Sequence, residues 1–306
     1  MYRLYFKIIL GNVLTSTFWL TAFKRLAKFF RMTNVYLKFK LLLKCNRLIF
    51  LYTLLSISVA NADGKKYRAI HSLYFGGFNF LESVTDFYAN KSYYKINTES
   101  STKGALNLVF DWKGIVKSEG IIKKSRLVPR NFKSLGRWGK EIWITDLTYN
   151  KDGQIFSTKV SPLPDAAEII PLPLNPGIGA IDPLSFILQF VINATVRASC
   201  KEEVVIFDGR RRYKLKIKEI GVKNFSKTRY NIFTGKALAC ELKYIPLGGQ
   251  RRRTFEPENQ NNLNIIYLAR PSPAAPIIPV SFSLDTSFGT LIGHLVTFES
   301  LGRSLK

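Results

Sequence analysis

Short runs in which apolar and polar residues alternate follow one another along the chain from Asp63 onward. In Tyr93–Ser100, for example, Tyr94, Ile96 and Thr98 share one face and the residues between them share the other. A period of two is typical of a strand with one buried face. The pattern predicts about a dozen strands among fourteen candidate runs. The runs are Tyr67–Leu73, Gly76–Leu81, Tyr93–Ser100, Ala105–Trp112, Gly114–Lys123, Glu141–Tyr149, Gln154–Val160, Val204–Phe207, Arg210–Ile217, Arg229–Phe233, Ala237–Tyr244, Leu263–Leu268, Val280–Leu284 and Gly289–Glu299.

Two turn motifs predict hairpins within this series. The tripeptide Lys-Asp-Gly at 151–153 separates two of the strands, and its glycine can take the positive φ that a tight turn needs. The dipeptide Asp208-Gly209 separates another two and is typical of a two-residue hairpin loop. In the strand that follows, Tyr213, Leu215 and Ile217 alternate with lysines, so one of its faces is expected in the core.

One helix is predicted, at about 183–193, directly after a proline-rich connector. Asp182 is a favourable N-cap and Pro183 suits the first helical position. Apolar residues then recur at the spacing of one helical face, at Leu184, Ile187, Leu188, Val191 and Ile192. The strand count and the absence of a flexible linker predict a mainly β fold. We expect a curved antiparallel half-barrel sheet with this one covering α-helix.

The leading 62 residues carry the pattern of an export signal that starts at Met32. Four basic residues precede the uncharged run Leu48–Val59, which ends in Ala-Asn-Ala at 60–62, and these are features of a cleavable signal. We predict a signal at 32–62 that is cleaved after Ala62, a periplasmic or secreted location, and a single β-rich domain at 63–306. The alternative is an uncleaved inner-membrane anchor, although the apolar run is shorter than the roughly 20 residues that span a bilayer. Residues 1–31 are predicted to be a non-native or leader extension upstream of a true start at Met32, and the alternative for Ile8–Phe23 is a first membrane helix.

Composition and charge narrow the class of protein. The 46% of hydrophobic residues exclude a disordered or collagen-like chain. The net charge is +25, but ten basic residues precede Asp63, the first acidic residue, so the remainder carries +15. A cytoplasmic protein this basic would be expected to bind nucleic acid, but predicted export removes that expectation, and we predict no nucleic-acid partner. The candidate anion-binding residues are Arg210, Arg211, Arg212, Arg251, Arg252 and Arg253.

These arginines have two interpretations. They could bind anionic lipid headgroups or polysaccharides of the cell envelope, which attract positive charge. Alternatively, they belong to solvated hairpin tips that bind nothing in particular.

Three cysteines remain to be placed. Cys45 lies inside the predicted signal, so Cys200 and Cys240 would form an even pair in the exported protein. Such a pair suits an oxidising compartment and predicts a disulfide, worth roughly 4 kcal/mol in the chain-entropy model. The alternative is two buried free thiols. Neither C-x-x-C nor Cys/His spacing occurs, so we expect no metal and no cofactor.

The sequence offers little for catalysis. Its histidines are His71 and His294, and neither stands near a serine or cysteine motif. Patterns for a serine hydrolase, a zinc protease or a P-loop are absent. Asp182 could act as a carboxylate base, but the helix cap explains it better. We therefore expect a protein that is not an enzyme.

Several motifs together resemble a known family. In order along the chain they are Asp182-Pro183-Leu184-Ser185, Cys200, Phe207-Asp208-Gly209-Arg210-Arg211-Arg212-Tyr213 and Cys240. This set resembles the bacterial family labelled domain of unknown function 3108, over about Tyr67 to Glu299. The resemblance implies an exported protein, mostly from alphaproteobacteria, with a half-open β-barrel similar to the lipoprotein carriers LolA and LolB. The family has no established activity, so no catalytic residue carries over.

A curved sheet that does not close fully and is partly covered by a helix can leave a concave apolar pocket suited to acyl chains. The candidate cavity residues are Leu184, Ile187, Leu188, Val191, Tyr213, Leu215 and Ile217. The alternative for most of them is plain core packing. The sequence thus predicts an exported envelope protein that binds a lipid or other amphiphile between sheet and helix. The alternative is a structural or interaction protein, or a secreted factor, that docks through its basic loops.

Overall fold

All the strands of the described chain belong to one antiparallel sheet. The computed structural model describes residues 64–104, 107, 111–252, 263–286 and 289–303. The sheet has 13 strands in the order β7-β6-β5-β4-β3-β2-β1-β13-β12-β11-β10-β9-β8. Their bounds are β1 Lys65–Phe75, β2 Phe78–Ala89, β3 Tyr93–Thr102, β4 Trp112–Lys123, β5 Arg126–Trp138, β6 Glu141–Tyr149, β7 Ile155–Ser161, β8 Glu202–Phe207, β9 Arg212–Phe225, β10 Gly235–Gly248, β11 Asn264–Ala269, β12 Ile278–Thr286 and β13 Gly289–Arg303. The predicted signal at 32–62 and the leader extension at 1–31 lie outside the described residues.

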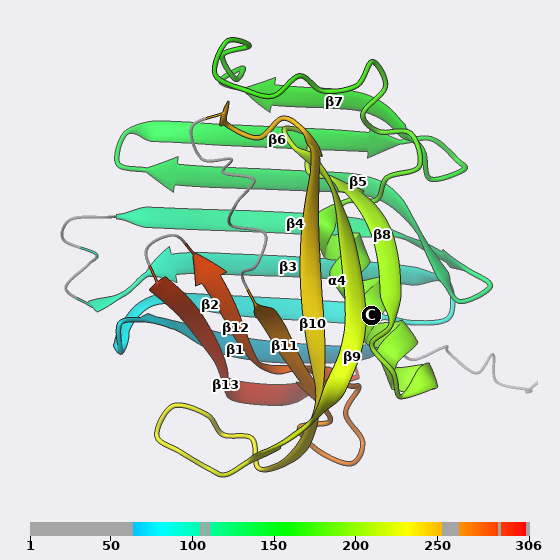
Figure 1. Ribbon diagram of the computed structural model, residues 1–306. Helices are drawn as coiled ribbons and strands as arrows, with labels where there is room; N and C mark the ends of the chain where they lie inside the picture. The colour runs from blue at the N-terminus through cyan, green and yellow to red at the C-terminus, as the bar shows by residue number, and fades with distance from the viewer. Residues whose placement is uncertain (1–63, 105–106, 108–110, 253–262, 287–288, 304–306) are drawn as a thin grey trace, which may run out of the picture. The chain divides into compact units, whose positions relative to one another are not determined.

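The sheet is two meanders joined where β1 pairs with β13, and it does not close on itself. Its two edges, β7 and β8, are consecutive in the chain, and the segment between them contains the helix α4, Pro183–Arg197. Figure 1 shows β8–β10 crossing in front of β3–β6 with α4 between the two layers. The prediction of a mainly β half-barrel with one covering helix is confirmed.

Bulges and close backbone contacts bend the sheet around the helix. The register between β4 and β5 shifts at Gly120, and such a bulge increases the local twist of a strand. A Cβ at Gly120 would stand 2.4 Å from the Val128 carbonyl oxygen and 2.9 Å from the Tyr94 ring. Glycine is therefore required where β4, β5 and a core side chain meet this closely.

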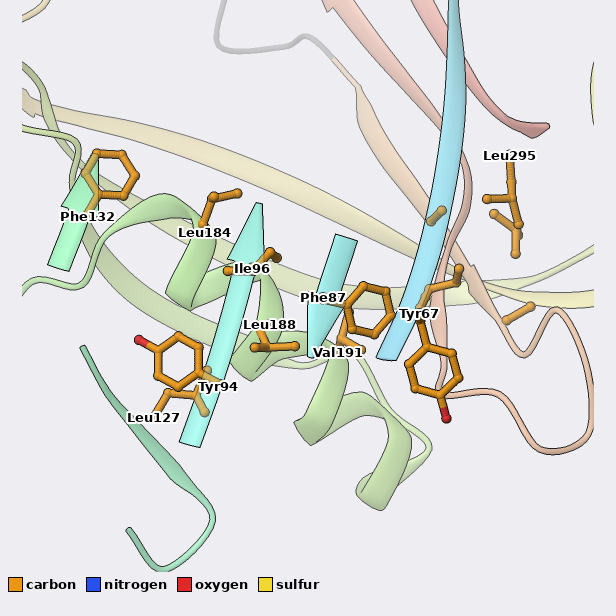
Figure 2. Close-up of a cluster of buried hydrophobic side chains, with 14 of the residues drawn as sticks. Tyr67, Phe87, Tyr94, Ile96, Leu127, Phe132, Leu184, Leu188, Val191 and Leu295 are labelled. Carbon is orange, nitrogen blue, oxygen red and sulfur yellow. The ribbon is translucent and has the colours of Figure 1, made fainter. Parts of the chain in front are cut away.

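The main core lies between α4 and the concave side of the sheet. Tyr94 and Ile96 are 0% and 1% exposed, as the alternation in β3 predicts. Figure 2 shows Leu184, Leu188 and Val191 of α4 against side chains of the sheet. Burial of one helical face against a sheet is the principal stabilising contribution to such a fold.

The predicted disulfide is confirmed. Cys200, just after α4, is bonded to Cys240 in β10, with 40 positions between them. Both cysteines are buried beside Phe190 and Ile206 in a second apolar cluster. The bridge fixes the segment between α4 and β8 to β10, two strands from β8 in the same half of the sheet. A bridge of this kind typically contributes about 2–4 kcal/mol to the free energy of unfolding.

Strand β5 is the largest omission of the sequence prediction. Pro129 interrupts its alternation, and proline is unfavourable inside a sheet because it cannot donate to a ladder. Here Pro129 stands opposite Gly120, where the register shifts, so the ladder is already broken.

The predicted strand at Arg229–Phe233 is wrong. Thr228 Oγ1 accepts hydrogen bonds from the amides of Tyr230 and Asn231, and Asn231 Oδ1 accepts one from Phe233. Side-chain acceptors of this kind favour turns over strands. Most of the predicted strand Ala105–Trp112 lies outside the described residues.

The Asp208-Gly209 hairpin exists, but its loop has four residues, 208–211, where the dipeptide predicts two. Asp208 Oδ1 accepts hydrogen bonds from the amides of Arg210 and Arg211, at 2.9 and 2.7 Å. The aspartate therefore closes a wider turn with its own side chain. Within the described part of the chain, no helix is both long and apolar enough to cross a membrane.

Candidate functional site

Helix α4 is anchored at its first turn by a buried polar group. Asp182 is the N-cap, and its Oδ1 accepts a hydrogen bond from Ser185 N at 2.8 Å. Its Oδ2 accepts hydrogen bonds from Ser118 Oγ in β4 and the Tyr149 hydroxyl in β6, at 3.2 and 3.1 Å. The Tyr94 hydroxyl of β3 and Ser185 Oγ lie 2.7 Å apart. These contacts fix the start of the helix over β3, β4 and β6.

Burial controls the protonation of this anchor. Asp182 is 0% exposed, and loss of solvation raises its pKa above the ordinary value, opposed by the hydrogen bonds from Ser185 and Tyr149. Burial, and then the charge of Asp182, also raise the pKa of Tyr94 and of Tyr149. Both phenols therefore stay protonated, and the Tyr149 hydroxyl donates to Asp182.

One side of α4 faces an apolar cavity of about 370 Å³. The opposite walls come from β1–β3 and from β9–β12, so both halves of the sheet contribute. The lining residues are Ala69, His71, Ser83, Thr85, Phe87, Ile96, Thr98, Leu184, Phe186, Ile187, Leu188, Phe190, Val191, Ile217, Leu242, Ile266, Ile278, Pro279, Phe282 and Leu284. Ile187 is 41% exposed, so the cavity reaches solvent beside the middle of the helix.

The polar side chains of the cavity wall are uncharged and paired. Thr85 Oγ1 and Thr98 Oγ1 lie 3.0 Å apart, and Ser83 Oγ accepts a hydrogen bond from Ser100 Oγ at 2.9 Å. His71 Nε2 lies 2.9 Å from the Pro279 carbonyl oxygen, to which it donates. Burial lowers the pKa of His71, so its ring is neutral. The wall can offer hydrogen bonds but no ionic partner.

With this geometry in place, the chain can be compared with known proteins. A family model described as "Protein of unknown function (DUF3108)" matches residues 71–296. The chain belongs to the DUF3108 family. A crystal structure of a β-barrel-like protein of domain of unknown function DUF1849 from Brucella abortus aligns with 12% identity and a TM-score of 0.46, over 78% of this chain and 98% of that chain. A search of curated proteins finds no significant match.

In this DUF3108 protein, five of the seven predicted cavity residues line the cavity: Leu184, Ile187, Leu188, Val191 and Ile217. Tyr213 and Leu215 do not. They pack against the second apolar cluster, and the Tyr213 ring lies 4.9 Å from the ring of Tyr244. The predicted inward face of β9 is correct, but the cavity ends before it reaches the start of that strand.

Sequence reasoning missed the walls from β1–β3 and β10–β12. Thr98 and Phe282, for example, are 184 positions apart in the sequence and line the same cavity only through the strand order of the folded sheet. Their alternation marks them as inward-facing, but no sequence signal distinguishes a cavity wall from a filled core.

The predicted anion-binding arginines are largely occupied by the protein itself. Arg210 donates to the carbonyl oxygens of Ile144, Ser161 and Pro162, at 3.2, 2.8 and 2.8 Å. It thereby fixes the β8–β9 loop to the end of β6–β7. Arg211 forms an ion pair with Asp208 at 2.9 Å.

The other four predicted anion-binding arginines differ in their surroundings. Arg212 donates to the carbonyl oxygens of Pro176 and Ile178. Arg251 lines a hollow of about 530 Å³ together with Arg210 and Arg211. Arg252 does not line it, although its amide donates to the Glu168 carbonyl, and Arg253 lies outside the described residues.

The two histidines lie in different settings. His71 is in the cavity wall, whereas His294 Nδ1 lies 3.3 Å from Ser281 Oγ. Ser281 is 3% exposed, and its hydroxyl donates to the Gly293 carbonyl at 2.9 Å. The Ser281 hydroxyl therefore donates to the backbone and not to His294. In the described part of the chain, no three His, Cys, Asp or Glu residues gather as a metal site.

Proposed function

We propose that this protein binds a lipid or another single-chain amphiphile in the cavity beside α4. The observation that carries the proposal is the cavity of about 370 Å³ with mainly apolar walls, which opens to solvent at Ile187. This volume holds roughly 12 groups of the size of a water molecule, and a methylene group is of similar size. It therefore suits one acyl chain of about ten to twelve carbons.

Binding by the mature chain tests this proposal. Decanol is titrated by calorimetry into residues 63–306 that have been purified and stripped of lipid. We expect saturation at one molecule per chain, with the negative heat-capacity change that accompanies burial of apolar surface. Absence of saturable binding would contradict the proposal.

We propose further that the protein acts in the cell envelope after export. The basic leader with Ala-Asn-Ala at 60–62 supports this, as does the Cys200–Cys240 bridge, which suits an oxidising compartment. N-terminal sequencing of the exported protein is expected to begin at Asp63. A product that begins upstream of Met32, or that keeps the segment 48–62, would contradict export by this signal.

Binding without catalysis is the third part of the proposal. It is supported by a cavity wall whose hydroxyls pair with one another and whose His71 holds a backbone carbonyl. Docking through the arginine clusters is the second candidate. The hollow shared by Arg210, Arg211 and Arg251 favours it, whereas the backbone and ion-pair contacts of Arg210 and Arg211 count against it.

A further inference from the structure

Three of the chain's four tryptophans gather at one end of β4–β6. Trp112 stands directly opposite Trp138 in the β4–β5 register, and Trp143 stands opposite Gly136 in the β5–β6 register. Trp112 is six positions before Ser118, whose hydroxyl bonds to Asp182 on the concave side. Residues an even number apart in a strand share a face, so these tryptophans lie on the side of the sheet that faces α4.

A glycine leaves room for the Trp112 ring, because a Cβ at Gly114 would stand 2.7 Å from that ring. The Trp143 ring needs no such space, since a Cβ at Gly136 would come no closer to it than 4.0 Å. The two rings give this end of the sheet an aromatic surface.

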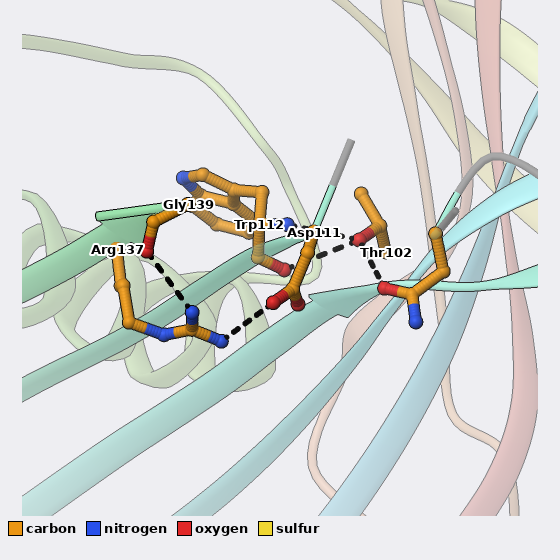
Figure 3. Close-up of polar contacts among 6 residues, drawn as sticks. Thr102, Asp111, Trp112, Arg137 and Gly139 are labelled. Carbon is orange, nitrogen blue, oxygen red and sulfur yellow. Dashed lines mark hydrogen bonds and ion pairs between the residues drawn. The ribbon is translucent and has the colours of Figure 1, made fainter. Parts of the chain in front are cut away.

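Hydrogen bonds hold this surface in place. Figure 3 shows the Trp112 backbone amide donating to Thr102 Oγ1 at 3.1 Å. Arg137 forms an ion pair with Asp111 at 2.9 Å and donates to the Gly139 carbonyl at 3.1 Å. These contacts join the ends of β3, β4 and β5. A surface fixed before binding loses less conformational entropy when a ligand arrives.

This aromatic surface continues the apolar cavity. Trp112 and Trp143 line a hollow of about 430 Å³, here called the tryptophan groove, which shares Thr98 and Leu184 with the cavity. The groove in turn shares Trp143, among other residues, with the hollow that Arg251 lines. A ligand whose apolar chain occupies the cavity would therefore extend its polar end past Thr98 onto the tryptophans.

The groove offers few charges that are free to bind an anion. Its charged residues are Asp208, Arg210 and Arg211. Arg211 is paired with Asp208, and Arg210 is bonded to backbone carbonyls. No lysine is among the lining residues of the groove, the cavity or the arginine-lined hollow in the described chain. A phosphate headgroup would lack free donors there.

Uncharged sugar rings fit this chemistry. The C–H face of a pyranose packs on the electron-rich face of an indole, and the half-buried Ser134 hydroxyl in the groove can bond to a sugar hydroxyl. We infer that the tryptophan groove binds the sugar head of a glycolipid whose acyl chain lies in the cavity. This inference rests on the proposed function.

The test compares two probes that share a ten-carbon chain, decyl maltoside and decanol, below the concentration at which the maltoside forms micelles. We expect the wild-type chain to bind decyl maltoside at least ten-fold more tightly than decanol. Trp143→Ala is expected to remove that difference without changing the Kd for decanol, whereas Trp143→Phe should retain most of it. Phe156→Ala is the matched control, because this exposed aromatic residue of β7 does not line the groove.

The outcomes separate the two proposals. If the wild-type chain binds both probes equally, the sugar site is overturned and the acyl cavity stands. The same holds if Phe156→Ala loses as much affinity for decyl maltoside as Trp143→Ala does. If neither probe binds, the cavity proposal fails with it. Should Trp143→Ala not fold, Trp112→Ala measures the same effect, and its unfolding temperature shows that it is folded.

Discussion

Ile187→Trp is expected to raise the Kd for decanol at least ten-fold while leaving the free energy of unfolding within about 1 kcal/mol of the wild type. Ile187 lines the cavity and is 41% exposed, so it stands at the mouth and not in the packed core. A larger ring there fills space that the ligand needs and does not have to displace buried neighbours. Calorimetric titration measures the Kd, and chemical denaturation measures the unfolding.

Ile220→Trp is the control for this substitution. Ile220 lies in β9, is 45% exposed and does not line the cavity. The same ring added there should leave decanol binding unchanged. If the two variants weaken binding equally, or if Ile187→Trp binds decanol normally, the ligand does not occupy the cavity beside α4.

Asp182→Ala is expected to lower the free energy of unfolding by about 3 kcal/mol. Loss of the N-cap costs about 1 kcal/mol. The Tyr149 hydroxyl loses its acceptor in a buried place, which costs about 2 kcal/mol, whereas Ser118 Oγ keeps the Asn131 carbonyl and Ser185 Oγ as partners. Equilibrium denaturation in urea measures the loss. An effect below about 1 kcal/mol would mean that this cluster does not anchor the helix.

Asp182→Asn separates the cap from the charge. Asparagine caps a helix as well as aspartate does, so the Ser185 amide keeps its acceptor. Its amide nitrogen replaces Oδ2, and the hydroxyls of Ser118 and Tyr149 must rotate to accept from it. The loss should therefore be smaller than for alanine. The pKa of Asp182 is raised in the folded protein, mainly by burial. The folded state therefore binds this proton more tightly than the unfolded state, and the stability that the carboxyl contributes falls as pH rises from the unfolded-state pKa to the folded-state pKa. The asparagine side chain carries no such proton, so the fall over that interval should be smaller in Asp182→Asn.

Local chemistry explains what the sequence could predict. The helix start at Asp182 and Pro183 depends on neighbouring residues only, and α4 extends the predicted 183–193 to Arg197. The alternation in β3 correctly separates Tyr94 and Ile96 from the solvent face. The Cys200–Cys240 bridge could be predicted from the number of cysteines that remain after the predicted cleavage.

The features that the sequence could not predict depend on strand register and on contacts between distant strands. Pro129 hides β5 from a pattern search, because the compensating shift at Gly120 is visible only once the strands pair. Asp182 reaches Ser118 and Tyr149 across 64 and 33 positions. The tryptophan groove likewise requires that Trp143 of β6 and Trp112 of β4 face the same hollow.

The arginine motif shows how such contacts change an interpretation. Arg210, Arg211 and Arg212 suggest an anion site in sequence, but in the fold they hold the hairpin loop and the proline-rich connector in place. The number of arginines in a motif therefore overstates its capacity to bind anions, because backbone carbonyls of the protein compete for the same donors.

Lipid extraction and mass spectrometry of the mature chain, purified from the envelope without detergent, show whether the cavity beside α4 holds a lipid. We expect one single-chain lipid for each wild-type molecule, together with marked depletion in Ile187→Trp and normal content in Ile220→Trp. A wild-type protein that is free of lipid and also fails to take up decanol would contradict the proposed lipid binding.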